Sequence, residues 1–274
     1  FAYPLPLSVK PLNKTNNHVI IDGNTAAGLA CVYAGATVGA WYPITPSTSL
    51  MDSFQAFCNQ LRKCEKTKKN NFCIIQAEYE LAAIGMVLGA SWNGARAFTP
   101  TSGPGILLMS EFIGFAYYSE LPAVIFDIQR AGPSTGMPTR TQQCDLMICA
   151  YASHGDTKHV LLIPSNPKEC FEFAAEAFDL ADRIQTPIII LSDLDLGMNN
   201  WVDDELKYTK PKYDRGKVLT EKDTEKLKDF GRYKDVDGDG IPYRTLPGNR
   251  APNAAFFTRG SGHNEEAKYT ESPE

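Results

Sequence analysis

Short apolar runs alternate with helical segments along most of the chain, and this alternation restricts the fold more than any other feature. The predicted strands cover residues 38–42, 72–76, 95–99, 122–129, 159–163 and 187–191. Strands that are apolar on both faces are typical of a parallel sheet with helices on each side. The sequence therefore predicts a doubly wound α/β fold with a mainly parallel sheet and right-handed crossover connections.

The chain divides into three parts by composition. Residues 1–17 are rich in proline, asparagine and lysine, which predicts an extended arm or linker. Residues 18–199 carry the alternating pattern of the α/β domain, whereas residues 200–274 are charged, punctuated by glycine and proline, and weakly periodic. We interpret this last part as an irregular extension that docks on a partner. Because the chain begins at Phe1 without a methionine, we also expect it to be part of a longer polypeptide.

Composition and charge exclude several functional classes. The net charge of −5 gives no electrostatic reason to expect binding to nucleic acid or to an anionic membrane. No apolar run reaches the ~18 residues of a spanning helix, and no signal-peptide pattern is present. None of the seven cysteines forms a CxxC pair, so the sequence predicts neither a zinc site nor an iron–sulfur cluster on this chain. We expect buried, reduced thiols in a cytoplasmic protein.

Polar side chains gather where the predicted strands end. Thr45, Glu80 and Arg130 each follow a different strand, and Thr101 with Ser102 follows another. Ligands of parallel α/β sheets bind beyond the carboxyl ends of the strands, so these residues define the candidate site. Arg130 can bind a carboxylate through two N–H groups, or it can form a structural salt bridge. The residue type and position leave both interpretations open.

A helix with two acidic residues near its start follows the strand at 72–76. Glu78 and Glu80 are predicted in its first turn, and Glu80 shares an apolar face with Ile84 and Val87. A carboxyl group on such a face can be buried and poised to share a proton. A carboxylate in the first turn can also serve only to complement the helix dipole.

The stretch Gly132–Gly136 matches the G-x-S-x-G pattern of a hydrolase, with Ser134 as the candidate nucleophile. Asp193 or Asp195 and then His263 follow in the order that α/β-hydrolases use. A nucleophile elbow needs a helix directly after the serine, whereas a stretch rich in proline, threonine and glutamine follows here. We therefore interpret the loop as a substrate lid or cradle and keep an α/β-hydrolase-like esterase as an alternative.

Three aspartates at alternate positions form the metal candidate of this chain. Asp235, Asp237 and Asp239 resemble the start of a calcium loop, with glycine at its sixth position. The twelfth position, which carries a bidentate glutamate in such loops, is Leu246 here. A tight Asp-Gly turn without a metal is the alternative.

Four ordered motifs together resemble the α subunit of 2-oxoacid:ferredoxin oxidoreductases, most closely the 2-oxoglutarate type. They are YPITPST at 42–48, QAEYELAAIGMVLGAS at 76–91, TSGPG at 101–105 and DIQRAGPSTGMPT at 127–139. The stretch DVDGDGIPYRTLPG and the closing GHNEEAKYTE are similar too, so the resemblance covers nearly the whole chain. In that family this region is the domain that binds the aminopyrimidine half of thiamine diphosphate.

The resemblance implies roles for individual residues. Glu80 corresponds to the glutamate that hydrogen-bonds N1′ of the cofactor, Thr45 to a threonine that touches the substrate, and Arg130 to the arginine that receives the substrate carboxylate. These three residues are the implied catalytic group. The further implied contacts are Pro43, Ile44, Thr101 and Ser102 for the cofactor, and Ser134 and Thr135 for the substrate.

The resemblance also implies partners. A separate β subunit would carry the diphosphate site, its Mg²⁺ and a 4Fe-4S cluster, and ferredoxin would receive the electrons. Coenzyme A would take the acyl group formed by oxidative decarboxylation of the 2-oxoacid. We expect a dimer of heterodimers in which this chain is active only with its β subunit. A non-catalytic assembly subunit that kept the fold is the alternative.

Overall fold

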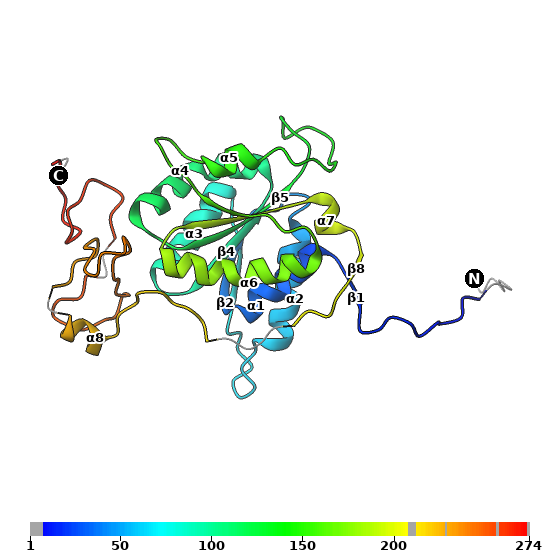
Figure 1. The fold of residues 1–274 in the computed structure, drawn as a ribbon, viewed down its shortest axis with the longest axis horizontal. Coiled ribbons are helices and arrows are strands. Elements are labelled where there is room, and N and C mark those ends of the chain that lie inside the picture. Colours follow the sequence, from blue (N-terminus) through cyan, green and yellow to red (C-terminus); the bar gives the residue numbers. More distant parts are fainter. Residues whose placement is uncertain (1–7, 208–211, 228, 256–257, 273–274) are drawn as a thin grey trace.

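A computed structural model describes residues 8–207, 212–227, 229–255 and 258–272, and a parallel sheet forms its centre (Figure 1). The strands lie in the order β3-β2-β4-β5-β7-β6, and every neighbouring pair is parallel. The predicted doubly wound α/β fold is therefore confirmed. The strands are β2 (Ala36–Trp41), β3 (Cys73–Gln76), β4 (Arg96–Thr101), β5 (Ala123–Gln129), β6 (Val160–Leu162) and β7 (Pro187–Asp193).

Helices pack on both faces of the sheet because successive strand residues point to opposite sides. Phe98 and Phe126 enter one apolar core, and Ala97 and Ile125 enter the other. The first core lies under α1 (Gly23–Tyr33), α2 (Thr48–Leu61), α6 (Pro167–Ile184) and α7 (Leu194–Met198), and the second lies under α3 (Glu80–Trp92), α4 (Gly103–Ser119) and α5 (Leu146–Ala150).

Within the described residues, no helix combines the length and the apolar character needed to cross a bilayer.

Two helices begin at other residues than the sequence predicts. Helix α3 begins at Glu80, so Glu78 precedes the helix and is exposed, and its predicted place in the first turn is wrong. The sequence predicts a turn at residues 101–105 before a helix that starts near Ile106, whereas α4 begins at Gly103. Pro104 explains this earlier start, because a proline in the first turn lacks only an N–H group that would have no partner within the helix.

A small ribbon joins the two ends of the α/β domain. Strand β1 (Val19–Ile21) pairs antiparallel with β8 (Trp201–Asp203), on either side of the predicted boundary at residue 199. The N-terminal arm leaves the ribbon and extends away from the domain (Figure 1). Residues 1–7 of the predicted arm lie outside the described residues.

The C-terminal extension contains α8 (Glu221–Lys226) and is held to the α/β domain by buried charges. Asp182 of α6 accepts hydrogen bonds from Arg96 Nε at 3.0 Å and from Arg244 Nη2 at 2.9 Å. Arg96 Nη2 also donates to the carbonyl oxygen of Asp214 at 2.8 Å. The described part of the extension thus contacts this chain's own domain, while its docking on a partner stays a prediction.

All seven cysteines are free thiols. Four are buried, Cys64 is half-buried, and Cys73 and Cys144 are exposed, so the expectation of buried thiols is wrong for these last three. Cys73 lies on the edge strand β3, and Cys144 lies in the loop before α5. The buried thiols are Cys31, Cys58, Cys149 and Cys170.

Candidate functional site

Glu80 lies at the first position of α3, and its side chain is only 5 % exposed. Within the described residues, no hydrogen bond or ion pair reaches its carboxyl group. A Cβ atom added at Gly105 of α4 would lie 3.0 Å from Glu80 Cγ and 1.9 Å from Thr101 Oγ1. The glycine therefore lets the starts of α3 and α4 approach closely. Because burying a carboxyl group without a partner costs free energy, Glu80 is suited to meet a ligand that donates a hydrogen bond.

The end of β4 supplies further polar groups beside Glu80. Thr101 and Ser102 are fully buried where β4 leads into α4. The hydroxyl of Ser102 has no partner among the described residues, and that of Thr101 makes a long hydrogen bond of 3.4 Å to the carbonyl oxygen of Ser102. The predicted cofactor contacts of β4 thus lie next to the predicted proton-sharing carboxyl group.

Arg130 connects two loops at the carboxyl edge of the sheet. It directly follows β5, is 8 % exposed, and donates from Nη1 to the carbonyl oxygen of Thr45 at 2.8 Å. Its Nη2 donates to the carbonyl oxygen of Thr135 at 3.0 Å. Among the described residues it has no carboxylate partner, so it forms no structural salt bridge there, and its Nε–H is buried without an acceptor. Arg130 therefore keeps hydrogen-bonding capacity beside the residues predicted to touch the substrate.

The loop after β2 is anchored by a residue that sequence reasoning missed. Asn24 of α1 donates from Nδ2 to the carbonyl oxygen of Pro46 at 2.9 Å and to Ser49 Oγ at 2.8 Å. These bonds hold the loop on which Thr45 is exposed. Asn24 lies in the first turn of α1, two residues after its cap Asp22, and no motif of the sequence marks it. The other predicted contacts of this loop are Pro43, which is exposed, and Ile44, which is half-buried.

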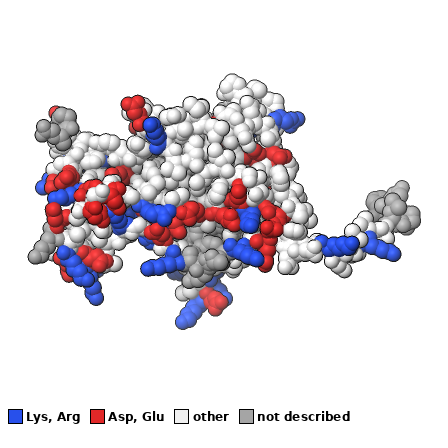
Figure 2. Space-filling view, in the orientation of Figure 1, with Lys and Arg blue, Asp and Glu red and all other residues white. Residues whose placement is uncertain are grey.

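A cavity of about 500 Å³ lies beside Arg130. Its walls come from the first turns of α4, the loop after β5 and the segment that leads into α5. Few charged side chains appear over the upper part of the molecule in Figure 2, where α4 and α5 lie. The lining includes Leu107, Leu108, Arg130, Ser134, Thr135 and Asp145.

Asp145 is a second buried acid of this site that sequence reasoning missed. It is 6 % exposed, and its carboxyl group meets the Asp127 carboxyl group and the Cys144 thiol rather than a cation among the described residues. A Cβ atom added at Gly103 would lie 2.5 Å from both carboxyl oxygens, so this glycine allows the acid to approach the first turn of α4. The backbone N–H of Asp145 donates to Gln129 Oε1 at 3.0 Å. No sequence pattern marks this contact, because Asp145 follows an aperiodic loop.

Asp145 interacts with a second buried acid, Asp127 of β5. Burial and the nearby Asp145 carboxylate raise the pKa of Asp127 well above its usual range. Burial likewise raises the pKa of Asp145. The thiol of Cys149 donates to Asp127 Oδ2 at 3.3 Å. Two carboxyl groups that share a buried region do not ionise independently, so this pair retains a proton to higher pH than an exposed aspartate does.

The residues of the hydrolase alternative do not form a triad. Ser134 Oγ accepts from the backbone N–H of Gly136 at 3.3 Å. His263 stacks on the ring of Tyr233, with the centroids 3.8 Å apart, and Asp193 caps α7. No helix directly follows Ser134. The local geometry therefore lacks both the elbow and the base that an esterase of this type needs.

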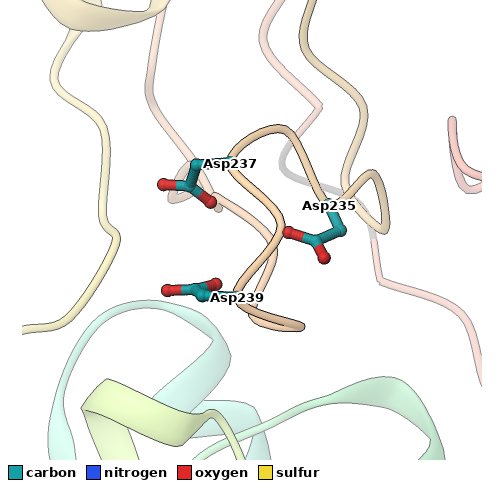
Figure 3. A group of neighbouring side chains, drawn as sticks. All are labelled: Asp235, Asp237 and Asp239. Atoms are coloured by element: carbon teal, nitrogen blue, oxygen red, sulfur yellow. The ribbon is translucent and has the colours of Figure 1, made fainter.

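The three aspartates of the metal candidate surround one turn (Figure 3). One oxygen from each of Asp235, Asp237 and Asp239 lies within 4.8 Å of the others. Lys217 Nζ, however, lies 2.6 Å from Asp237 Oδ1 and 2.6 Å from Asp239 Oδ1. Both oxygens of Asp235 accept hydrogen bonds from the backbone N–H groups of Gly238 and Gly240. The lysine ammonium thus pairs with two of the three aspartates, and both the metal site and the metal-free Asp-Gly turn stay predictions.

Comparison with known proteins identifies the class to which this fold and site belong. Residues 29–234 match the family described as pyruvate flavodoxin/ferredoxin oxidoreductase, thiamine diP-binding. The chain belongs to this family. The family resemblance inferred from the four motifs is therefore confirmed.

Two relatives of known name are similar to this chain in sequence. The chain is 37 % identical over 270 residues to the α subunit of 2-oxoacid:ferredoxin oxidoreductase 1 from Sulfurisphaera tokodaii, covering 96 % of this chain and 42 % of that protein. It is 42 % identical over 173 residues to the 2-oxoglutarate synthase subunit KorA from Methanocaldococcus jannaschii, covering 63 % of this chain and 45 % of that subunit.

A solved structure is similar over nearly the whole chain. It is the 2-oxoglutarate:ferredoxin oxidoreductase from Magnetococcus marinus with 2-oxoglutarate, coenzyme A and succinyl-CoA bound. The TM-score is 0.83 and the sequence identity 32 %, covering 99 % of this chain and 44 % of that one. The chain thus spans less than half the length of these relatives.

Proposed function

We propose that this chain is the part of a 2-oxoacid:ferredoxin oxidoreductase α subunit that activates thiamine diphosphate and binds the 2-oxoacid. The observation that carries the proposal is Glu80, whose buried carboxyl group has no partner among the described residues and lies at the sheet edge where α/β folds bind ligands. 2-Oxoglutarate is the expected substrate, since relatives are named for it and the similar solved structure holds it.

The residues around Glu80 fit the aminopyrimidine half of the cofactor. Gly105 lets the first turn of α4 approach Glu80 closely, and the Ser102 hydroxyl, which has no partner among the described residues, can bond a polar ring. Bound thiamine diphosphate supplies a carbon nucleophile for the keto group and an electron sink for decarboxylation. Glu80 would hold a proton at N1′ of the aminopyrimidine and so favour the basic form of its exocyclic nitrogen.

The loops joined by Arg130 would orient the substrate. The arginine can receive the carboxylate of the 2-oxoacid with the N–H groups that its two carbonyl contacts leave over. Thr45 and Thr135 lie on the loops that Arg130 holds together, and Ser134 lines the same cavity. An apolar cavity wall excludes water and strengthens the charge-assisted bond.

The remaining parts of the reaction require partners. We propose a β subunit that carries the diphosphate site, Mg²⁺ and a 4Fe-4S cluster, with ferredoxin as the electron acceptor and coenzyme A as the acyl acceptor. A cytoplasmic dimer of heterodimers is the expected assembly. The retained Glu80 favours this function over a non-catalytic assembly subunit, which would not need a buried acid without a partner.

The experiment is a reconstitution. The full α subunit that contains this chain is combined with its β subunit, and ferredoxin reduction is measured with 2-oxoglutarate and coenzyme A. We expect turnover by the complex and none by either subunit alone. Turnover by this chain alone, or a complex that is inactive on every 2-oxoacid tried, contradicts the proposal.

A further inference from the structure

Two buried ionisable side chains line the same cavity. Arg130 is 8 % exposed and its Nε–H has no acceptor among the described residues, and Asp145 is 6 % exposed and shares a proton with the Asp127 carboxyl group behind it. Most of the lining is apolar and includes Leu107, Leu108 and Ile148. The cavity therefore offers a ligand one cation with an N–H group to spare and, at another place, one acid without a cation beside it.

The proposed function supplies such a ligand. A 2-oxoacid bound by its carboxylate to Arg130 carries a side chain that must lie along the remaining walls. Arg130 is the only cation among the residues known to line the cavity, and Asp145 is the only acid. The side chain of the substrate would therefore meet apolar carbon and one carboxyl group, and no second positive charge among the described lining residues.

We propose that Asp145 is a specificity-determining residue that senses the charge of the 2-oxoacid side chain, an inference that rests on the proposed function. In its ionised form Asp145 opposes a second carboxylate in the cavity, because like charges in a desolvated site repel strongly. In its protonated form it donates a hydrogen bond to that carboxylate. Binding of a 2-oxoacid with an apolar side chain should differ little between the two forms of Asp145.

The surroundings of Asp145 raise its pKa above that of an exposed aspartate. Burial raises its pKa, and no cation pairs with its carboxyl group among the described residues. Below this raised pKa the acid is neutral and a dicarboxylate is accepted; above it the acid is charged and a dicarboxylate is disfavoured. The groups that face Asp145 are Asp127 of β5, Cys144 beside it in the chain, Arg130 of the same cavity, the first turn of α4 at Gly103, and Cys149 of α5 through Asp127.

The test compares two substrates in the assembled α–β enzyme. The ratio of kcat/KM for 2-oxoglutarate to that for 2-oxobutyrate is measured across the pH range in which the enzyme is stable. We expect the wild-type ratio to fall as pH rises. In Asp145→Asn, which keeps the shape and removes the charge, the ratio should be independent of pH and roughly tenfold higher at the alkaline end, because a like charge no longer opposes the second carboxylate.

Two variants separate specificity from structure. Asp145→Glu keeps the charge and should retain the pH-dependent ratio, whereas Asp156→Asn, an exposed aspartate in the loop after α5, should behave as wild type. If Asp145 only stabilises the first turn of α4, its substitution changes kcat/KM for both substrates by the same factor. A ratio that stays at the wild-type value therefore overturns the inference. Should Asp145→Asn fail to fold, a wild-type ratio that does not vary with pH overturns it. A complex without activity on either substrate would contradict the proposed function itself.

Discussion

The two edges of the parallel sheet bury polar groups in opposite ways. At the amino edge, Arg96 opens β4 and is paired with Asp182, which also binds Arg244. At the carboxyl edge, within the described residues, Glu80 has no hydrogen-bond partner and Asp145 meets another acid, Asp127, rather than a cation. All of these side chains are nearly inaccessible to water. Burial alone therefore does not distinguish a structural charge from a functional one, but the pairing of its atoms does.

The difference follows from what each edge stabilises. A buried ion network satisfies its own charges, and breaking it leaves a desolvated charge that opposes folding. An unpaired carboxyl group already opposes folding, so its removal does not weaken the fold and changes only what the site can bind. Substitutions at the two edges should therefore separate into effects on activity and effects on stability.

Glu80→Gln should give the largest effect on activity. The amide keeps the size of the side chain but cannot hold the proton at N1′ of the aminopyrimidine. Exchange of the C2 proton of bound thiamine diphosphate should slow by a factor on the order of 10² to 10⁴, the usual contribution of a positioned acid–base group. The measurement is hydrogen–deuterium exchange at C2 in the assembled enzyme, alongside the free energy of unfolding, which should not fall.

Glu78→Gln is the matched control. Glu78 is exposed and precedes α3, so its substitution should leave C2 exchange at the wild-type rate. A larger defect in Glu78→Gln than in Glu80→Gln would mean that the wrong glutamate is assigned to N1′. Normal exchange in Glu80→Gln would leave only a role for this residue at the start of the helix.

The carboxyl edge was largely predictable from the sequence. Apolar runs identified the strands of the parallel sheet, and the rule that ligands bind at their carboxyl ends selected Thr45, Glu80 and Arg130. The start of α3 was less certain, since propensity does not separate Glu78 from Glu80. That start became clear only with the extended backbone of Tyr79 just before the helix.

Contacts between distant segments could not be predicted. Asn24 anchors the loop after β2, and Asp145 reaches the first turn of α4, but neither residue stands in a periodic segment or a motif. Lys217 pairs with the acidic turn across 20 residues or more, which a local comparison with calcium loops ignores. Such pairings depend on how loops pack, and local hydrophobic periodicity carries no information about that packing.

Asp182→Ala should give the largest effect on stability. The change leaves Arg244 without its carboxylate and removes one of the two carboxylates of Arg96. Breaking a buried ion pair from one side costs about 3 to 5 kcal/mol, so the free energy of unfolding should fall by that amount. Denaturant unfolding of the purified chain measures it. Glu176→Ala is the control, because its ion pair with Arg183 is exposed and should contribute less than about 1 kcal/mol.

Arg130→Lys should give the smallest of these effects, and it tests the one residue that has features of both edges. Arg130 is paired with two carbonyl oxygens yet keeps an unpaired Nε–H. Lysine keeps the positive charge but loses the planar fork, so it cannot bond both loops and the substrate together. Losing a hydrogen bond to a charged group costs about 1.5 to 3 kcal/mol, which predicts a KM for the 2-oxoacid raised by roughly ten- to hundredfold.

The control for Arg130→Lys is Arg140→Lys, on the same loop, because Arg140 is exposed and donates only to the neighbouring carbonyl oxygen of Thr139. Its KM should stay at the wild-type value. If Arg130→Lys lowers the free energy of unfolding and leaves KM unchanged, Arg130 acts only as a tie between loops, like the paired charges of the amino edge. A raised KM with unchanged thiamine diphosphate binding would instead assign it to the substrate, because the proposed cofactor contacts, Glu80 and Ser102, lie on other elements.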